Sequence, residues 1–384
     1  MGQAIVILGG GTGGVVAANV LRQLVPPAHT ITVIDRRENH QFQASFPLVL
    51  IGHRRAEDVV RPLSALREKG IEFVQAEITG VDLQTRQVHT NVGTLAYDYL
   101  IISLGAERHP QSVPGFKEAV FDAHSLRHLQ QLAAELPRFH RGRIVLFISH
   151  LPFSGTVGPY EMVLLLSDFF HRQKRRHVQL TLVTPEPYLL SAAGPRLGPR
   201  FQDLCLQQGI RVVTQARVLY LDHRTGHLVL DGGIYIPGDM FIGVPSHRGP
   251  TILRKTILSQ DGGWLKAHPY TLATAVPKVF AIGDAVGIRL PVTGAWLPKA
   301  GVFAHYQAEM VARNIALELA GKPPRFRFTG KAVGASLITS LGRAMPLSIR
   351  AYQPTGPRLS LLPPLRLGYA AKVAFEQYWL NRWF

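Results

Sequence analysis

Three glycines near the amino terminus have the spacing of a phosphate-binding turn. Gly9, Gly11 and Gly14 form a G-x-G-x-x-G pattern that follows an apolar run and precedes a helical pattern. The first glycine permits a tight turn, the second lets the backbone approach a pyrophosphate, and the third lets the helix pack on the strand. The helix N-terminus would stabilise the phosphate charge. The pattern therefore predicts a dinucleotide site, and the alternative is a glycine-rich turn without a ligand.

An acidic residue supports the first interpretation. Asp35 ends the next apolar run, 24 residues after Gly11, where a carboxylate can accept hydrogen bonds from a ribose. Thr12 and Gly13 in the turn, and Arg36 after the acid, are further candidates for contact with the cofactor.

The elements that position these residues form a repeated pattern. A strand, a helix and a second strand span residues 4–35, and a similar succession of helix, strand, helix and strand follows residue 114. Residues 277–287 again resemble the strand and glycine turn of the first unit, and a long helical pattern covers 301–319. The predicted fold class is α/β with two Rossmann-like dinucleotide-binding domains. The predicted boundaries are 1–112 and 245–320 for a discontinuous first domain, 113–244 for the second, and 321–384 for a C-terminal region.

The net charge of the chain indicates which kinds of partner it could bind. The 384 residues carry 42 Lys and Arg against 25 Asp and Glu, a formal net charge of +17. Such an excess favours an anionic partner, either nucleic acid or a membrane surface. The sequence contains no nucleic-acid-reading motif, so we expect a membrane and no nucleic acid.

The cysteine count and the apolar runs set further limits. Cys205 is the one cysteine, which excludes an internal disulfide and a multi-cysteine metal cluster, and no metal site is expected. The first apolar run leads directly into the glycine turn, so we expect no signal peptide. No run approaches 20 apolar residues, so we expect no transmembrane span. The expected location is the cytoplasmic side of a membrane.

Two later segments identify the cofactor by resemblance. YDYLIISLG (97–105) and TAVPKVFAIGDA (274–285) resemble motifs of the pyridine nucleotide-disulfide oxidoreductase superfamily, and the likeness extends over residues 1–320. The resemblance implies FAD, and non-covalent binding is favoured over the alternative of covalent attachment. It implies that Asp284 binds the ribityl chain of the flavin, that Gly283 permits close approach, and that Gly105 lies at the site. The alternative for FAIGDA is a buried strand and turn.

Within this superfamily the sequence resembles sulfide:quinone oxidoreductases, and next type II NADH:quinone oxidoreductases. The segments concerned are HQFQASFPLVLIG (40–52), LPFSGTVGPYE (151–161) and LPKAGVFAHYQAEMVARNIA (297–316). The likeness places Lys299, Ala300 and Gly301 near the flavin ring, with Lys299 as a catalytic candidate. The N-terminus of their helix would stabilise negative charge on the reduced flavin.

One departure changes the expected chemistry. The family's sulfide enzymes use cysteines beside the flavin, and this chain has Ser154 in the loop where one would stand. A serine lacks the nucleophilicity and redox chemistry of a thiolate. Cys205 lies in a helical pattern elsewhere and is expected to pack as a small hydrophobe. Sulfide oxidation by the usual route is therefore disfavoured.

Because sulfide oxidation is disfavoured, NADH becomes the favoured electron donor. Gly155 and Gly158 retain half of a second glycine fingerprint, and Glu161 matches a glutamate that lies near the nicotinamide in the type II enzymes. Glu186 ends the next strand, where it could meet a ribose. Glu161 is therefore the second catalytic candidate. The alternative is a degenerate domain that binds no dinucleotide.

The C-terminal segment resembles an interfacial membrane anchor. From Tyr369 to Phe384, the residues Tyr369, Val373, Trp379 and Trp383 follow one helical face, and Lys372 and Arg382 flank it. Aromatic residues at headgroup depth and cations on anionic lipid are typical of such helices. The alternative is a helix packed on the protein's own core or in a homodimer.

These observations predict a peripheral membrane flavoenzyme. Electrons would pass from NADH through FAD to a membrane quinone, as in type II NADH:quinone oxidoreductases. One alternative is a divergent sulfide:quinone oxidoreductase-like enzyme without the cysteine pair. Another is an FAD-binding electron-transfer subunit with a protein donor.

Overall fold

The computed structural model describes residues 2–191, 194, 197–290 and 292–384, and its first domain is built on a parallel sheet. The strands lie in the order β20-β9-β1-β2-β5. Their bounds are β1 Ala4–Leu8, β2 Thr30–Asp35, β5 Glu72–Gln75, β9 Tyr99–Ile102 and β20 Val279–Ala281. Strand β20 comes from a part of the chain far from the other four, so the first domain is discontinuous.

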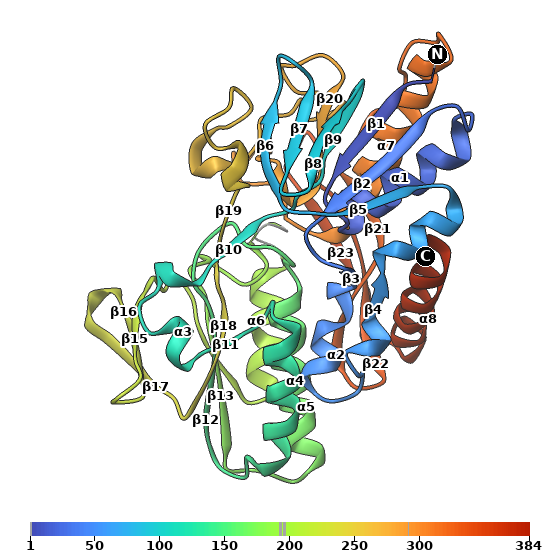
Figure 1. Ribbon diagram of the computed structural model, residues 1–384. Helices are drawn as coiled ribbons and strands as arrows, with labels where there is room; N and C mark the ends of the chain where they lie inside the picture. Colours follow the sequence, from blue (N-terminus) through green and yellow to red (C-terminus); the bar gives the residue numbers. More distant parts are fainter. Residues whose placement is uncertain (1, 192–193, 195–196, 291) are drawn as a thin grey trace.

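Two helices cover this sheet and pack against each other (Figure 1): α1 (Thr12–Leu24) and α7 (Gly301–Leu319). Helix α1 buries a face of small and branched residues that includes Val15, Val16 and Ala17. Small residues on this face let the helix approach the sheet closely. As a result, the packing of α1 on the sheet fixes the position of the turn between β1 and α1.

The second domain repeats this arrangement with the strand order β11-β18-β12-β13-β14, all parallel. Its strands are β11 Phe121–Asp122, β12 Gly142–Ile148, β13 Val178–Val183, β14 Ile210–Val213 and β18 Met240–Val244. Its helices are α3 Phe116–Ala119, α4 Leu126–Glu135, α5 Gly158–Arg172 and α6 Gly198–Gln207. The two parallel sheets confirm the predicted α/β class with two Rossmann-like units.

Small antiparallel sheets join and extend the two domains. β10 (Glu107–His109) pairs with β19 (Ser246–Arg248) where the chain passes between them. The remaining small elements are β3 Asn39–Gln41, β4 Val60–Pro62, α2 Phe46–Leu50, β6 Ile78–Asp82, β7 Gln87–Thr90, β8 Gly93–Ala96, β15 Val218–Asp222, β16 His227–Leu230 and β17 Ile234–Pro237.

The C-terminal region contains a three-stranded antiparallel sheet and a final helix. The strands are β21 (Lys331–Ser340), β22 (Arg343–Arg350) and β23 (Arg358–Leu361), and the helix is α8 (Arg366–Trp383). β21 contacts α5 of the second domain and α7 of the first, and α8 packs on β22. The region therefore bridges both domains.

The prediction that the helical face of α8 with Trp379 and Trp383 points outward, as in a membrane anchor, is wrong. Trp379 and Trp383 are 2% and 5% exposed and point into the protein, where Trp379 stacks on His40 and contacts Phe42. Trp379 is buried against the segment around His40, and Trp383 packs against His305 of α7. The large exposed apolar residues of α8 are instead Leu367, Phe375 and Tyr378. In the described residues, no helix is both long and apolar enough to span a membrane.

Candidate cofactor and electron-transfer site

The glycine turn has the geometry that its sequence predicts. Gly9 has φ +103°, and a Cβ there would lie 2.4 Å from the Ser103 carbonyl oxygen. At Gly14 a Cβ would lie 1.8 Å from the carbonyl oxygen of Gly9, so the helix can pack on the strand only without a side chain. A Cβ at Gly11 would meet nothing within 4 Å. The turn is thus closed on the protein side and open on the other.

Asp35 fastens this turn at the end of β2. One carboxylate oxygen accepts a hydrogen bond from the amide of Gly10 at 2.7 Å, and the other accepts one from Arg37 at 2.8 Å. His40 binds the same turn, with its Nδ1 3.0 Å from the Gly10 carbonyl oxygen. Burial lowers the pKa of His40 to about 4, so this imidazole is neutral at pH 7.

The open side of the turn faces a cavity of ≈ 1410 Å³ between the two domains and the C-terminal region. This volume exceeds a usual small-molecule pocket. The predicted site residues that line it are Gly9, Gly11, Thr12, Gly13, Asp35, Arg36, Gly105, Gly155, Gly158, Glu161, Gly283, Asp284, Ala300 and Gly301. Gly14, Glu186 and Lys299 do not line it.

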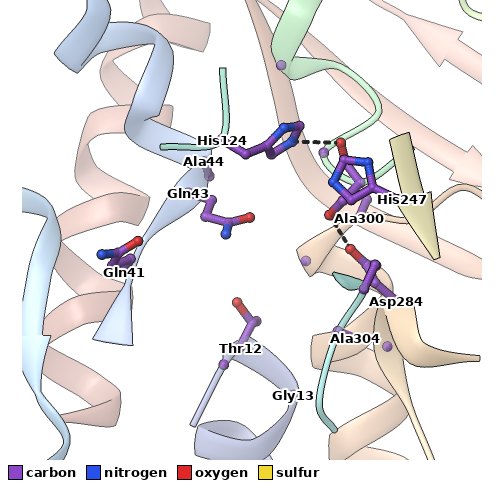
Figure 2. A pocket seen from close by; sticks show the side chains of 18 of the residues that line it. Thr12, Gly13, Gln41, Gln43, Ala44, His124, His247, Asp284, Ala300 and Ala304 are labelled. Atoms are coloured by element: carbon purple, nitrogen blue, oxygen red, sulfur yellow. Dashed lines mark hydrogen bonds between the residues drawn. The ribbon is translucent and has the colours of Figure 1, made fainter. Parts of the chain in front are cut away.

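Asp284 lies on the wall opposite the segment of Gln43 and Ala44 (Figure 2). The Ser154 hydroxyl, from the loop after β12, donates a hydrogen bond to its carboxylate. Burial raises the pKa of Asp284, and Lys299 and the Ser154 hydrogen bond oppose this rise. The neighbouring Gly283 has φ +70°, and its amide donates to the side-chain oxygen of Gln307 at 2.6 Å. The second motif is therefore fixed by both domains.

The side chain of Lys299 lies behind this wall. Its ammonium donates to the backbone carbonyl oxygens of Asp284 and Val286, each at 2.9 Å, and lies 3.7 Å from the centre of the Trp264 ring. Burial lowers the pKa of Lys299 to about 8. This geometry does not match the predicted catalytic contact. The ammonium is buried because it satisfies carbonyls that the turn at Asp284 leaves unpaired.

The lining residues fit a dinucleotide such as FAD. Helices α1 and α7 both begin at the cavity, with no acidic residue in the first turn and no side-chain cap. Their free amides can therefore face an anion. The space beside Gly11 would accommodate a pyrophosphate at backbone distance, and Asp284 lies farther along the same cavity.

Glu161 forms an ion pair and a hydrogen bond with residues of the C-terminal region. Its carboxylate, 2% exposed, pairs with Lys372 of α8 and accepts a hydrogen bond from the Ile338 amide at 2.7 Å. Burial raises the pKa of Glu161, and the ammonium of Lys372 opposes this effect. Glu161 and Lys372 both line the cavity. Lys372 is thus part of the interior and not the free flanking cation that was predicted.

Glu186 accepts hydrogen bonds from other residues of the second domain. Its carboxylate accepts hydrogen bonds from the Tyr160 and Thr184 hydroxyls and from both the amide and the hydroxyl of Ser191. It is 1% exposed, and burial raises its pKa to about 7. These donors use the acceptor positions of the carboxylate. Glu186 therefore cannot also accept the predicted hydrogen bonds from a ribose.

Four histidines that line the cavity, His40, His124, His247 and His305, were not singled out from the sequence. His40 lies beside the glycine turn, and His124 and His247 lie together at the second domain. Single histidines carry no spacing signal, and only the fold brings 124 and 247 together. Cys205 is fully buried in α6, and burial raises its pKa to about 12, in agreement with the packing role expected from the sequence.

Comparisons with known proteins agree with this geometry. The family model described as pyridine nucleotide-disulphide oxidoreductase matches residues 3–308. A sulfide-quinone reductase of Aquifex aeolicus is 27% identical, covering 99% of this chain and 91% of the relative. A type II NADH:quinone oxidoreductase of Staphylococcus aureus is 20% identical, covering 89% of each. Among solved structures, the sulfide:quinone oxidoreductase of A. aeolicus superposes with a TM-score of 0.87 at 23% identity, over 99% of this chain and 91% of that one.

Proposed function

The chain belongs to the pyridine nucleotide-disulphide oxidoreductase family and is an FAD-dependent oxidoreductase, and we propose that it reduces a membrane quinone. Electrons would enter at the side of the second domain and leave at the C-terminal region. Bound FAD would supply the two-electron redox chemistry. The glycine turn and Asp35 would hold its adenosine and pyrophosphate, and Asp284 its ribityl chain.

The observation that carries the proposal is the extent of the cavity. It runs from the glycine turn to an apolar chamber beneath α8, where the lining residues include Ala335, Leu347, Ile349 and Trp379. Phe375 and Val333 line the same cavity and are 41% and 39% exposed, so the cavity is open to solvent beside them. An apolar chamber of this kind suits a quinone ring, and its mouth suits entry from lipid.

A membrane surface fits the region around this mouth. Leu362, Leu365, Leu367 and Tyr378 are all large and exposed there, between 41% and 77%. Exposed Arg366 stands among them. An exposed apolar group with cations beside it is typical of a protein that lies on anionic lipid. The formal charge of +17 favours the same partner.

Within the chamber, Lys372 and Glu161 supply the polar groups. An ammonium held against a carboxylate in an apolar wall can donate a hydrogen bond to a quinone carbonyl oxygen. Glu161 would hold the ammonium of Lys372 in place through their ion pair.

A blocking substitution tests the proposal. Ala335→Trp places an indole in the chamber, whereas Ala371→Trp adds the same group to an exposed position of α8 outside the cavity. In protein loaded with FAD and reduced by dithionite under anaerobic conditions, a soluble quinone should reoxidise the flavin in the wild type and in the Ala371 variant. The Ala335 variant should reoxidise at least about tenfold more slowly, a loss of about 1.4 kcal/mol in barrier lowering. Equal rates in all three would exclude this chamber.

The donor is the second question. NADH is the donor favoured by the sequence, but the contacts of Glu186 and Glu161 leave neither carboxylate free for it. Anaerobic stopped-flow mixing with NADH separates the cases. A flavin that bleaches on the turnover timescale supports NADH, and one that stays oxidised removes it.

A further inference from the structure

The outer face of the C-terminal sheet carries three cations side by side. Lys331 of β21 lies opposite Arg350 of β22, which in turn lies opposite Arg358 of β23. Residues that are directly opposite in an antiparallel sheet project from the same face. All three are exposed, whereas the next residues, Ile349 and Leu359, project from the other face and line the cavity. We call Lys331, Arg350 and Arg358 the cation row.

The cation row by itself destabilises the sheet. Neighbouring strands lie only about 4.8 Å apart, and like charges directly opposite each other repel. None of the three cations forms an ion pair with a carboxylate of the described residues. The guanidinium of Arg358 donates to the Thr355 hydroxyl at 3.2 Å, a neutral acceptor that does not offset the charge. The row therefore matches an oxyanion such as a phosphate group, which arginine and lysine bind through charge-assisted hydrogen bonds.

The surrounding segment contains almost no acid that could neutralise the row. Residues 322–384 include ten Lys and Arg and one acidic residue, Glu376. Glu376 is buried and pairs with Arg54 of the first domain. Because this region has no other carboxylate, we expect the anion that neutralises the row to come from outside the chain.

Along β23 the outer face changes from charged to apolar. Arg358, Ser360 and Leu362 are exposed at alternate positions, and Ser360 lies opposite Ser348. Leu362 continues the strand, since its amide donates to the Pro346 carbonyl oxygen at 3.0 Å, and its side chain is 54% exposed. At about 3.3 Å per residue, Leu362 lies roughly 13 Å from Arg358. The face thus presents cations, then hydroxyls, then an apolar side chain.

The apolar end of this face decides between a free phosphate and a lipid. Leu365 and Leu367 follow Leu362 and are 41% and 77% exposed. Arg343 and Arg366, also exposed, lie at the same end, so cations border the leucines on both sides. A free phosphate would satisfy the cation row and leave the leucines in water. A phospholipid covers both, with its phosphate on the cations and its acyl chain on the leucines.

We propose that the cation row binds the phosphate of an anionic phospholipid, with Ser348 and Ser360 at the level of the glycerol esters and Leu362 against an acyl chain. The proposal rests on the proposed function, because that function brings the C-terminal region to a membrane. It adds to the membrane contact a defined site for one headgroup phosphate.

Vesicle binding by FAD-loaded protein tests the row against general charge. The vesicles contain phosphatidylcholine and phosphatidylglycerol, whose only charge is its phosphodiester. Lys331→Gln with Arg350→Gln and Arg358→Gln should weaken binding about 100-fold, because each cation at a lipid surface contributes about 1 kcal/mol. Arg211→Gln with Arg217→Gln and Arg224→Gln removes the same charge from exposed positions of the second domain and should change the affinity less than about twofold. Equal affinities of the two triple variants would overturn the proposal.

A soluble lipid separates a defined site from a charged surface. Dihexanoyl-phosphatidylglycerol, below its micelle concentration, should bind saturably in calorimetry and at least about tenfold more tightly than its deacylated headgroup. Leu362→Ser should weaken binding of the lipid and leave binding of the headgroup unchanged. Inorganic phosphate or a single-stranded oligonucleotide that binds the row more tightly than the lipid does would contradict the lipid assignment.

Thermal unfolding shows whether the row serves folding instead. Arg350→Gln removes the central cation, so the melting temperature without lipid should stay level or rise, and stabilisation by the soluble lipid should be lost. A lower melting temperature with unchanged lipid binding would assign the row a structural role.

The two proposals fail separately. If quinone does not reoxidise the reduced flavin but the row variant loses phosphatidylglycerol binding, only the proposed function fails. If quinone reoxidises the flavin and the row variant binds lipid as the control variant does, only the cation row is excluded.

Discussion

Individual residues show which parts of the glycine turn serve folding and which serve the ligand. Gly14 touches backbone, whereas Gly11 borders open space on the cavity side. The same sequence pattern therefore contains a structural glycine and a binding glycine, and substitution should separate them.

We expect Gly14→Ala to destabilise the protein and Gly11→Val to leave it folded. A methyl group at position 14 would lie 1.8 Å from the Gly9 carbonyl oxygen, so the helix must shift, at a cost of about 1–3 kcal/mol. A side chain at position 11 should instead occupy the pyrophosphate space and abolish FAD binding. Thermal unfolding and the flavin absorbance measure the two effects. A Gly11 variant that retains FAD would show that the cofactor takes another path.

Lys299 gives a prediction about pH. Its pKa is lowered from 10.5 to about 8 in the folded protein, so between these values the unfolded chain binds more protons. Stability carried by this group should then rise as pH increases from 8 to 10.5 and stay level below that window. Lys299→Met should remove this rise. The free energy of unfolding, measured against pH for both proteins, isolates the group because other titrations cancel in the difference.

At the scale of elements, helix α8 is held by contacts to three parts of the protein. Its Glu376 accepts a hydrogen bond from Ser45 and pairs with Arg54 at 2.9 Å. Trp379 donates to Nδ1 of His305 in α7 at 3.3 Å, and the Asn19 amide in α1 donates to the Trp383 carbonyl oxygen at 3.1 Å. The helix is therefore a wall of the cavity as well as a surface element.

Truncation of the buried indole should loosen this wall. Trp379→Ala removes the ring that contacts His40 and Phe42, and such changes in a core cost about 3–5 kcal/mol. Hydrogen exchange should rise first in α8, while exchange in the parallel sheets stays slow. Tyr378→Ala, at a 62% exposed neighbour, is the control and should leave exchange unchanged. Uniform destabilisation of the whole chain in the Trp379 variant would contradict a local role.

The sequence predicted where helices and strands lie along the chain better than which of their side chains are buried. The predicted helix at 301–319 coincides with α7, and the βαβ unit at the glycine turn is present as expected. Both carry strong local signals, namely apolar periodicity and glycine spacing. The orientation of α8 depended on what the segment around His40 offers it, and the bonding of Glu186 depended on Tyr160 and Ser191. Such contacts are tertiary, and no local pattern encodes them.

At the scale of the molecule, charged and exposed apolar residues are concentrated in different places. One group of exposed apolar residues lies at the C-terminal region, and a second lies on β15 and β17. Lys117, Arg254 and Lys255, which have no ion-pair partner among the described residues, line the cavity beside the second domain. Membrane association should depend on the first group and on the total charge of +17. It should therefore respond to both salt and apolar substitution, whereas a purely electrostatic contact responds to salt alone.

Leu367→Asp with Tyr378→Asp tests this distinction. Both side chains are exposed, at 77% and 62%, so the folded protein should retain its stability and its flavin. Cosedimentation with vesicles that contain anionic lipid should fall about tenfold or more, because two apolar contacts are lost and two like charges face the membrane. Ile234→Asp with Tyr235→Asp changes two other exposed apolar residues, at 51% and 59% in β17, and is the control. If both variants bind vesicles as the wild type does, the face around α8 is not the membrane contact.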